Sequence, residues 1–227
     1  MSKTYASSDW HGNLNAAVAA LNYLNDDDIL YYLGDAIDRG KYGMEIIDML
    51  RNRPNTIFLK GNHEDLMYHG CKNRLDTKLW IENNGGYATL LSFSKKTKEQ
   101  QEEYLNWIKN LPVNFQYVNK NNQNIMLSHS GFNPWKRPYF ADDFIWDREH
   151  MNGCWSSKKE WENVYVVHGH TPTPLMKPKY GSTQKDPCVV KYQNGHKINI
   201  DLGTVWTNLT CLLDLDTLEP IYVKGEK

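Results

Sequence analysis

The opening 62 residues alternate between short apolar runs and segments with the periodicity of an amphipathic helix. In the first helical segment, Leu14, Val18, Leu21 and Leu24 fall on one face, and Pro54 ends the second. The predicted strands are 4–8, 28–34 and 55–62, and the predicted helices are 13–24 and 42–53. This order predicts an α/β fold in which parallel strands are joined by helices.

The stretch from about 64 to 111 is mostly helical, and we interpret it as a helical insertion. Beyond it, apolar runs predict further strands, and Asn194-Gly195 between two of them predicts a hairpin. The runs are 113–118, 124–131, 164–171, 188–195, 196–203, 209–216 and 220–225. They indicate a second sheet that is partly antiparallel.

Two long irregular stretches, at about 132–163 and 173–187, interrupt these strands. Loops of that length in a compact domain are usually functional. The chain contains no internal repeat, low-complexity tract or linker, so we expect residues 1–227 to form a single domain.

Polar clusters of Asp, His and Asn follow five of the predicted strands. The clusters are Asp9–Gly12, Gly34–Gly40, Gly61–Glu64, His129–Gly131 and Gly169–Thr171. In open α/β sheets, ligand sites form beyond the carboxyl ends of the strands. We therefore expect all five clusters to meet at one rim of the fold.

The residue types in these clusters indicate metal chemistry. Carboxylates, imidazoles and an amide oxygen, without a thiolate, suit Mn, Fe or Zn. Six candidate ligands are too many for one catalytic ion that keeps an open position. They suit two ions that share a bridging carboxylate, an arrangement typical of phosphate ester hydrolysis.

Any one of these residues has an ordinary structural explanation, and only the set favours a metal site. Asp9 or Asp38 alone would be read as a helix or turn cap, and a lone His129 or His170 as a satisfied polar residue. Several neighbours keep structural roles. Trp10 is expected to pack in the core, and His168 is expected to be a strand residue beside the site. Glu64 is expected to hydrogen-bond near the metals, and Asp201 is expected either to do the same or to stabilise a turn. The remaining histidines are expected on the surface or in loops: His69, His150 and His196.

The motifs D-x-H-G, G-D-x-x-D-R-G, G-N-H-E, H-x-G and G-H-T, in this order, resemble the PPP-type branch of the calcineurin-like metallophosphoesterases. The resemblance extends from Asp9 to about Asp216. The closing segment 197–217 is similar to the small bacterial and phage members, which include serine/threonine phosphatases and the symmetrical diadenosine tetraphosphate hydrolases. The resemblance implies an α/β fold of two mixed β-sheets packed as a sandwich and flanked by helices.

The resemblance also implies a role for each site residue. It assigns the first metal to Asp9 and His11, the bridge to Asp35, and the second metal to Asn62, His129 and His170. His63 would be the general acid, with Asp38 orienting it. Arg39 would bind phosphate, with Asn62 also contributing to substrate binding, and the segment IWDREH makes Arg148 a second phosphate-binding residue. The implied reaction is a single in-line displacement without a covalent phosphoenzyme.

The leading functional hypothesis is a phosphatase for phosphoserine and phosphothreonine in proteins, with phosphotyrosine as a further substrate. The alternative is a dinucleoside polyphosphate hydrolase that uses the same site. A non-catalytic scaffold is disfavoured because no implied ligand or acid is missing. The implied cofactors are two metal ions, with manganese expected in vitro and iron or zinc as alternatives.

Composition bears on partners and location. The net charge of −1 indicates no basic face, so a nucleic-acid partner is not expected. The four dispersed cysteines form no C-x-x-C pair and are expected to be buried thiols. There is no apolar leader and no apolar run of membrane length, so we expect a cytoplasmic protein without a membrane partner.

Overall fold

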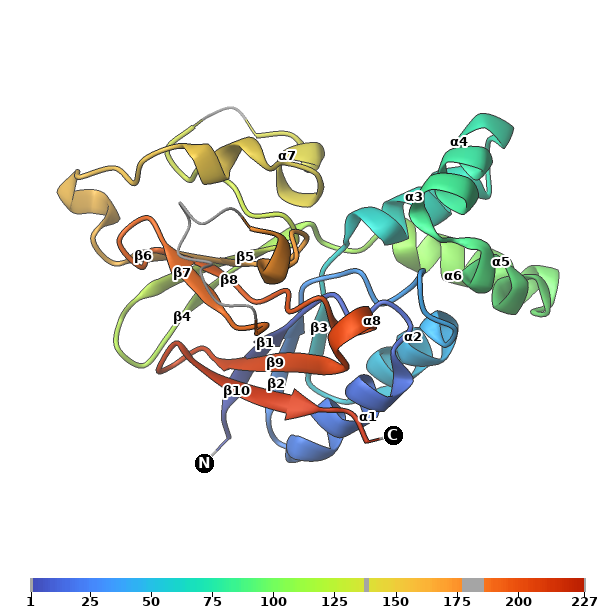
Figure 1. The fold of residues 1–227 in the computed structure, drawn as a ribbon, viewed down its shortest axis with the longest axis horizontal. Helices are drawn as coiled ribbons and strands as arrows, with labels where there is room; N and C mark the ends of the chain where they lie inside the picture. The colour runs from blue at the N-terminus through green and yellow to red at the C-terminus, as the bar shows by residue number, and fades with distance from the viewer. Residues whose placement is uncertain (1, 137–138, 177–185, 227) are drawn as a thin grey trace.

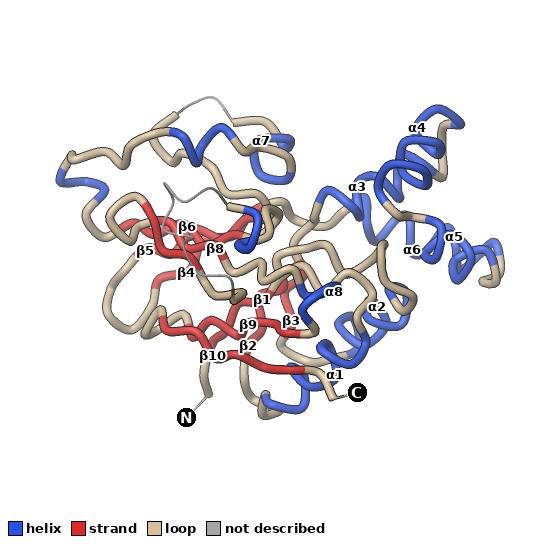
Figure 2. Tube along the Cα trace, viewed as in Figure 1, coloured by secondary structure: helices blue, strands red, loops and turns tan. Residues whose placement is uncertain are grey.

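Two five-stranded sheets make up the centre of the protein in a computed structural model that describes residues 2–136, 139–176 and 186–226 (Figures 1 and 2). The first sheet has the order β10-β9-β1-β2-β3, and β1, β2 and β3 are parallel as the sequence predicts. Its strands are β1 (Thr4–Ser7), β2 (Ile29–Tyr32), β3 (Thr56–Phe58), β9 (Leu209–Asp214) and β10 (Glu219–Lys224).

The second sheet has the order β4-β5-β6-β8-β7 and mixes parallel with antiparallel pairs. Its strands are β4 (Asn114–Val118), β5 (Asn124–Ser128), β6 (Val164–His168), β7 (Val190–Tyr192) and β8 (Lys197–Asn199). The predicted hairpin joins β7 to β8, and Asn194 and Gly195 both adopt positive φ there. Both mixed sheets are thus confirmed.

Helices form at the positions that local signals favour. The Asn13 side chain caps α1 (Leu14–Tyr23), and α2 (Gly43–Asn52) ends before Pro54. A capping box of Thr97 and Gln100 begins α6 (Lys98–Lys109). The other helices are α3 (Asn62–Gly70), α4 (Arg74–Lys78), α5 (Tyr87–Ser94), α7 (Ala141–Ile145) and α8 (Thr204–Thr207). A π-helical turn covers Leu79–Asn83, and 3₁₀ turns cover Glu149–Asn152, Lys159–Trp161 and Thr173–Leu175.

Side chains along the strands of the first sheet point alternately to its two faces, and this divides the hydrophobic core into two clusters. Tyr5 and Tyr32 face a cluster that includes residues of α1, α2, α3 and α6, whereas Ala6 and Tyr31 face the second sheet. Since successive side chains of a strand point to opposite faces, one sheet supplies both clusters. A third cluster, which includes Phe144 of α7, covers the outer face of the second sheet. Figure 1 shows the resulting layers, with α3 to α6 projecting to one side. The predicted sandwich flanked by helices is confirmed.

Three features differ from the sequence predictions or lie beyond them. β9 and β10 follow the strands of the second sheet in the chain but return to the first sheet, where β9 pairs antiparallel with β1. The prediction of buried thiols is confirmed only for Cys211, since Cys71 and Cys154 are exposed and Cys188 is half-buried. Most of the predicted loop at 173–187 lies outside the described residues. No helix in the described ranges is both long and apolar enough to span a membrane.

Candidate active site

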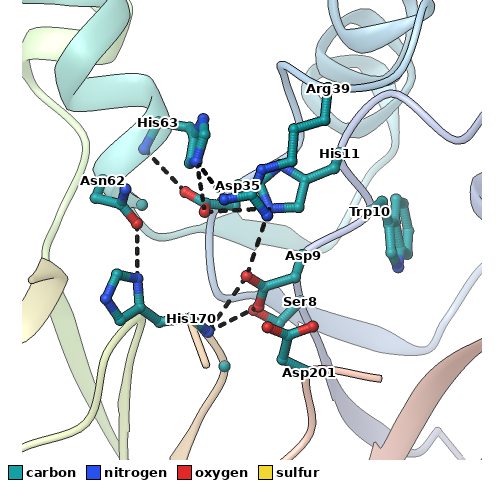
Figure 3. Close-up of polar contacts among 12 residues, drawn as sticks. Ser8, Asp9, Trp10, His11, Asp35, Arg39, Asn62, His63, His170 and Asp201 are labelled. Atoms are coloured by element: carbon teal, nitrogen blue, oxygen red, sulfur yellow. Dashed lines mark hydrogen bonds and ion pairs between the residues drawn. The ribbon is translucent and has the colours of Figure 1, made fainter. Parts of the chain in front are cut away.

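Loops from both sheets meet in one buried polar cluster (Figure 3). Asp9, Asp35 and Asn62 follow β1, β2 and β3, while His129 and His170 follow β5 and β6. The six predicted metal ligands are each at most 6% exposed; they are Asp9, His11, Asp35, Asn62, His129 and His170. The five polar clusters of the sequence therefore do converge, because the carboxyl ends of these strands lie together.

The backbone of this cluster turns through the left-handed region at residues that are not glycine. The site residues with φ between 43° and 68° are Asp9, His11, Asp35, Asp38, Arg39 and His170. Each such residue costs of order 1–3 kcal/mol and persists only where the surrounding structure holds it. Glycines let the loops approach closely, since a Cβ on Gly12 would lie 2.5 Å from the carbonyl carbon of Gly40. Six of the twelve non-glycine residues with positive φ in the described ranges lie in this cluster.

Asn62, His129 and His170 bring three donor atoms into one small volume. Oδ1 of Asn62 lies 2.9 Å from Nε2 of His129 and 2.7 Å from Nδ1 of His170. The two imidazole nitrogens are 3.1 Å apart. Separations of about 3 Å are those of neighbouring ligands around one ion with bonds of about 2.1 Å. These three atoms form the group predicted to hold the second metal.

Asp35 lies between this group and a second one. Its Oδ2 is 3.4 Å from Nε2 of His129 and 3.4 Å from Nε2 of His11. Asp9 is more distant, with Oδ1 3.9 Å from Nε2 of His11. Among the described residues, distance alone identifies two groups of side chains able to hold an ion: His11, Asp35 and His63, and Asp35, His129 and His170. Asp35 belongs to both, whereas His63 takes the place predicted for Asp9.

The histidine rings are oriented as metal ligands usually are. Nδ1 of His129 donates to the carbonyl of Leu33 at 2.8 Å, and Nδ1 of His11 donates to the carbonyl of Ile37 at 2.9 Å. Because a carbonyl only accepts, Nδ1 of each ring carries a proton, and Nε2 is the nitrogen that faces Asp35 and can bind a metal when the ring is neutral. Metal-binding histidines commonly donate their other nitrogen in this way. This donor set fits a pair of metal ions.

Burial and mutual contact shift the pKa values of Asp35, His129 and Asp9. Burial would raise the pKa of Asp35, but His129 and His63 outweigh it and hold the pKa well below its usual value. Burial would lower the pKa of His129, but Asp35 outweighs it and raises the pKa to about 9. Burial raises the pKa of Asp9 to about 6. These buried carboxylates require positive charge nearby, which bound cations would supply more strongly than an imidazolium.

His63 is held by Asp38, and Asp38 is held by a residue that sequence reasoning missed. Nδ1 of His63 donates to Oδ2 of Asp38 at 2.7 Å. The indole nitrogen of Trp80 donates to the same oxygen at 2.8 Å, and the Asp38 amide donates to Thr89 at 2.9 Å. Burial would lower the pKa of His63, yet Asp35 and Asp38 raise it. No spacing in the sequence links Trp80 or Thr89 to Asp38.

Two arginines face the cluster from its exposed side. Arg39 donates through Nη1 to Nε2 of His11 at 2.9 Å and through Nη2 to Nε2 of His63 at 3.0 Å. Nε of Arg148 donates to the Thr171 hydroxyl at 3.2 Å. Burial and the neighbouring Arg39 guanidinium lower the pKa of Arg148. Both predicted phosphate-binding arginines are thus exposed and lie beside residues of the polar cluster.

The residues given structural roles mostly behave as expected. Glu64 accepts hydrogen bonds from the amides of Asp35, Ala36 and Gly61, at 2.8, 2.9 and 3.0 Å. Trp10 is buried and donates to Thr210. Figure 3 shows Asp201 beside Ser8 and Asp9, where burial and Asp9 raise its pKa well above the usual value.

His150 lies in a loop as predicted, but it is not on the surface. It belongs to the predicted loop 132–163, yet its side chain is 1% exposed and packs across from His168. The segment that carries it folds onto β8, where Lys197 donates to it. His69 is exposed as expected, and His168 is the buried last residue of β6.

Comparisons with known proteins agree with this architecture. The family model described as calcineurin-like phosphoesterase matches residues 2–202. A serine/threonine-protein phosphatase 2 from Salmonella typhimurium is 28% identical over 156 residues, which are 67% of this chain and 67% of that protein.

Two solved structures share the fold across all of this chain. One is a provisionally assigned diadenosine tetraphosphatase, with a TM-score of 0.61, 16% identity and 95% of that chain covered. The other is a Saccharomyces cerevisiae protein serine/threonine phosphatase similar to human phosphatase PP5, with a TM-score of 0.59, 13% identity and 81% of that chain covered. At these identities the similarity concerns the fold alone.

Proposed function

The chain belongs to the calcineurin-like phosphoesterase family, and on that premise we propose that it is a metal-dependent phosphatase for phosphoserine and phosphothreonine in proteins. The observation that carries the proposal is the pairing of His63 with Asp38 beside the shared carboxylate. Nε2 of His63 lies 3.8 Å from Oδ2 of Asp35, and its Nδ1 is committed to Asp38. The similarity to a bacterial serine/threonine-protein phosphatase supports the choice of substrate.

Two metal ions would be held by the converging donors, with Asp35 shared between them. The ligand set is Asp9, His11, Asp35, Asn62, His129 and His170. When bound, the cations would supply Lewis acidity, neutralising charge on the phosphoryl oxygens and easing deprotonation of the attacking water. We propose manganese for assays in vitro, with iron or zinc as alternatives, since all three accept nitrogen and oxygen donors.

His63 is proposed to protonate the leaving oxygen. A serine or threonine alkoxide is a poor leaving group, so a proton delivered in the transition state lowers the barrier. Since the Nδ1 proton is held by Asp38, the transferred proton must come from Nε2. Arg39 donates to that nitrogen in the structure. It must therefore turn toward the phosphoryl oxygens before His63 can act.

Arg39 and Arg148 are proposed to bind the phosphoryl group from the open side. A guanidinium presents paired N–H donors that match phosphate oxygens. Both side chains are exposed, which leaves them free to reorient around a substrate. Asn62 would contribute from the metal side. Charge on the phosphoryl oxygens would thus be stabilised from two directions during in-line attack.

The test is a side-by-side assay of purified protein with added manganese. The substrates are a phosphothreonine peptide and diadenosine tetraphosphate, and an aryl phosphate serves as a generic substrate. We expect fast release of phosphate from the peptide and loss of that activity in His63→Asn. His69→Asn, an exposed histidine on the same helix α3, is the matched control and should keep full activity.

The outcomes separate the candidate functions. Preferential cleavage of the dinucleotide would move the protein to the nucleotide hydrolases and leave the metal-site assignment standing. An inert protein on all three substrates, with manganese, iron and zinc each tried, would overturn the catalytic proposal itself.

A further inference from the structure

Lys197 of β8 is a fully buried lysine whose hydrogen bonds go to neutral groups. Its side chain is 0% exposed. Nζ donates to Oδ1 of Asn133 at 2.7 Å, to the carbonyl of His150 at 3.1 Å and to Nδ1 of His150 at 3.0 Å. A buried ammonium is costly unless its donors are satisfied. Lysine carries three donors, and here three acceptors meet them.

All three acceptors belong to the segment that crosses the outer face of the second sheet. Asn133 lies near its start and His150 near the 3₁₀ turn Glu149–Asn152. One ammonium therefore ties two points of that segment, 17 residues apart, to a central strand. The side chain of Gln193 adds a hydrogen bond to the carbonyl of His150 at 3.0 Å. Hydrogen bonds from Lys197 and Gln193 thus anchor the turn Glu149–Asn152 to the second sheet.

Arg148 immediately precedes this turn as its capping residue. From there its side chain reaches Thr171, just after the proposed metal ligand His170. β8, which carries Lys197, pairs in parallel with β6, the strand that leads to His170. The same strand pair therefore holds the metal side of the site and, through Lys197 and His150, the backbone from which Arg148 extends.

We propose that Lys197 is a positioning residue for Arg148: by anchoring the turn Glu149–Asn152 through His150, it sets how well Arg148 binds the phosphoryl group. This inference rests on the proposed function, in which Arg148 contacts phosphoryl oxygens. Lys197 touches neither substrate nor metal. Its effect should therefore appear in phosphate affinity and should require Arg148.

The experiment is a double-mutant cycle on the manganese-loaded full chain. Lys197→Met, Arg148→Ala and the double variant are compared by KM and kcat on an aryl phosphate and by the inhibition constant of inorganic phosphate. We expect Lys197→Met to weaken phosphate inhibition and raise KM by about tenfold, with a much smaller change in kcat. In the Arg148→Ala background, the same substitution should change neither value by more than about twofold.

A merely structural role gives a different pattern. In that case Lys197→Met would weaken phosphate inhibition by the same factor whether or not Arg148 is present, and the proposal would be overturned. Lys191→Met is the matched control, because Lys191 lies on neighbouring β7, is exposed and pairs with Glu219 at 2.9 Å. It should leave both KM and phosphate inhibition unchanged.

A second pair of variants keeps the test decisive if Lys197→Met does not fold. His150→Asn retains an acceptor near the position of Nδ1, whereas His150→Leu removes it. We expect the asparagine variant to keep phosphate affinity close to that of the unmodified protein and the leucine variant to weaken it about tenfold. Equal affinities in the two variants would overturn the proposal.

Failure of the inference is distinguishable from failure of the proposed function. If phosphate affinity is unchanged in Lys197→Met but weakened in Arg148→Ala, only the proposed role of Lys197 is overturned. Unchanged affinity in Arg148→Ala overturns the proposed phosphate contact of Arg148 and the inference with it. Peptide dephosphorylation by the unmodified protein stands or falls separately from both.

Discussion

The indole nitrogen of Trp80 lies 2.8 Å from Oδ2 of Asp38, the oxygen that also accepts the Nδ1 proton of His63. Both Trp80 and Asp38 are fully buried. A buried carboxylate needs hydrogen-bond donors, and two donors on one oxygen fix its direction. Trp80 therefore holds the carboxylate that is proposed to orient the proton donor.

Trp80→Phe should lower kcat by about tenfold, because one hydrogen bond to a charged group contributes about 1.5–3 kcal/mol. KM should change little, since the phosphate contacts are elsewhere. Steady-state kinetics on a phosphothreonine peptide measure both values. Trp107→Phe, a partly buried tryptophan on α6, is the control and should leave kcat unaltered. An unchanged kcat in Trp80→Phe would mean that Asp38 needs no second donor.

Gly86→Ala tests the contact between Trp80 and Asp38 by crowding the indole instead of removing its nitrogen. A Cβ on Gly86 would overlap Nε1 of Trp80, although the glycine has an ordinary φ of −72°. The added methyl should push the indole away from Asp38 and lower kcat. Gly153→Ala is a matched control, with φ of −75° and no atom nearer than 3.7 Å to the added carbon. Equal kcat values for the two variants would contradict this account.

His63→Asn should lose 10²–10⁴-fold in kcat on a phosphothreonine peptide, the range expected for a general acid. The loss should be smaller on an aryl phosphate with an acidic leaving phenol, because that oxygen departs without a proton. Rates for a series of aryl phosphates measure this dependence. Equal losses across the series would show that His63 does not protonate the leaving group.

Removing metal should destabilise the folded protein. Ions bound only by the native state stabilise it by mass action, about 2.7 kcal/mol at a free concentration 100 times Kd. We expect manganese to raise the Tm of chelator-treated protein, with two ions bound per chain. Asp35→Asn should reduce that number, because Asp35 belongs to both ligand groups. Elemental analysis and thermal denaturation are the measurements, and a stoichiometry of one would refute the shared-carboxylate assignment.

Asp28→Asn should destabilise the protein at neutral pH but much less at acidic pH. Burial would raise the pKa of Asp28, but hydrogen bonds from the Lys3 amide and from Asn25 outweigh it and lower the pKa. The stabilisation is therefore present above the unfolded pKa, about 3.9, and is lost as pH falls through the lower folded value.

Urea denaturation at pH 7 and pH 3 measures this difference. We expect Asp28→Asn to cost about 1–3 kcal/mol at pH 7 and less at pH 3. The exposed neighbour Asp27→Asn is the control and should have little effect at either pH. A cost that is independent of pH would show that the charge of Asp28 does not contribute.

Most of the candidate site could be located from local sequence because its residues follow strands directly. Asp9, Asp35 and His129 each come within a few residues of the end of an apolar run, so a short window of sequence is enough to identify them. The parallel order of β1, β2 and β3 then places the first three clusters at one edge. Their assigned roles in metal binding and catalysis remain predictions, since proximity alone does not demonstrate them.

Contacts between distant segments were not accessible in this way. Trp80 is 42 residues from Asp38, and Lys197 is 47 residues from His150. The same limit explains why the burial of His150 was not predicted, since its loop folds onto the second sheet. β9 likewise pairs with β1, a strand some 200 residues earlier, and β10 joins the same sheet by pairing with β9.

The sequence by itself determined which residues end each strand, and hence the set of donors available for metal and phosphate. Short-range periodicity and turn chemistry carry that information. Only the tertiary structure decided which side chains hold those donors in place: Trp80 on Asp38, Glu64 beneath the Asp35 loop, and Lys197 under His150. A hydrogen bond depends on distances of a few tenths of an ångström, which are set by the packing of the whole chain and not by its local order.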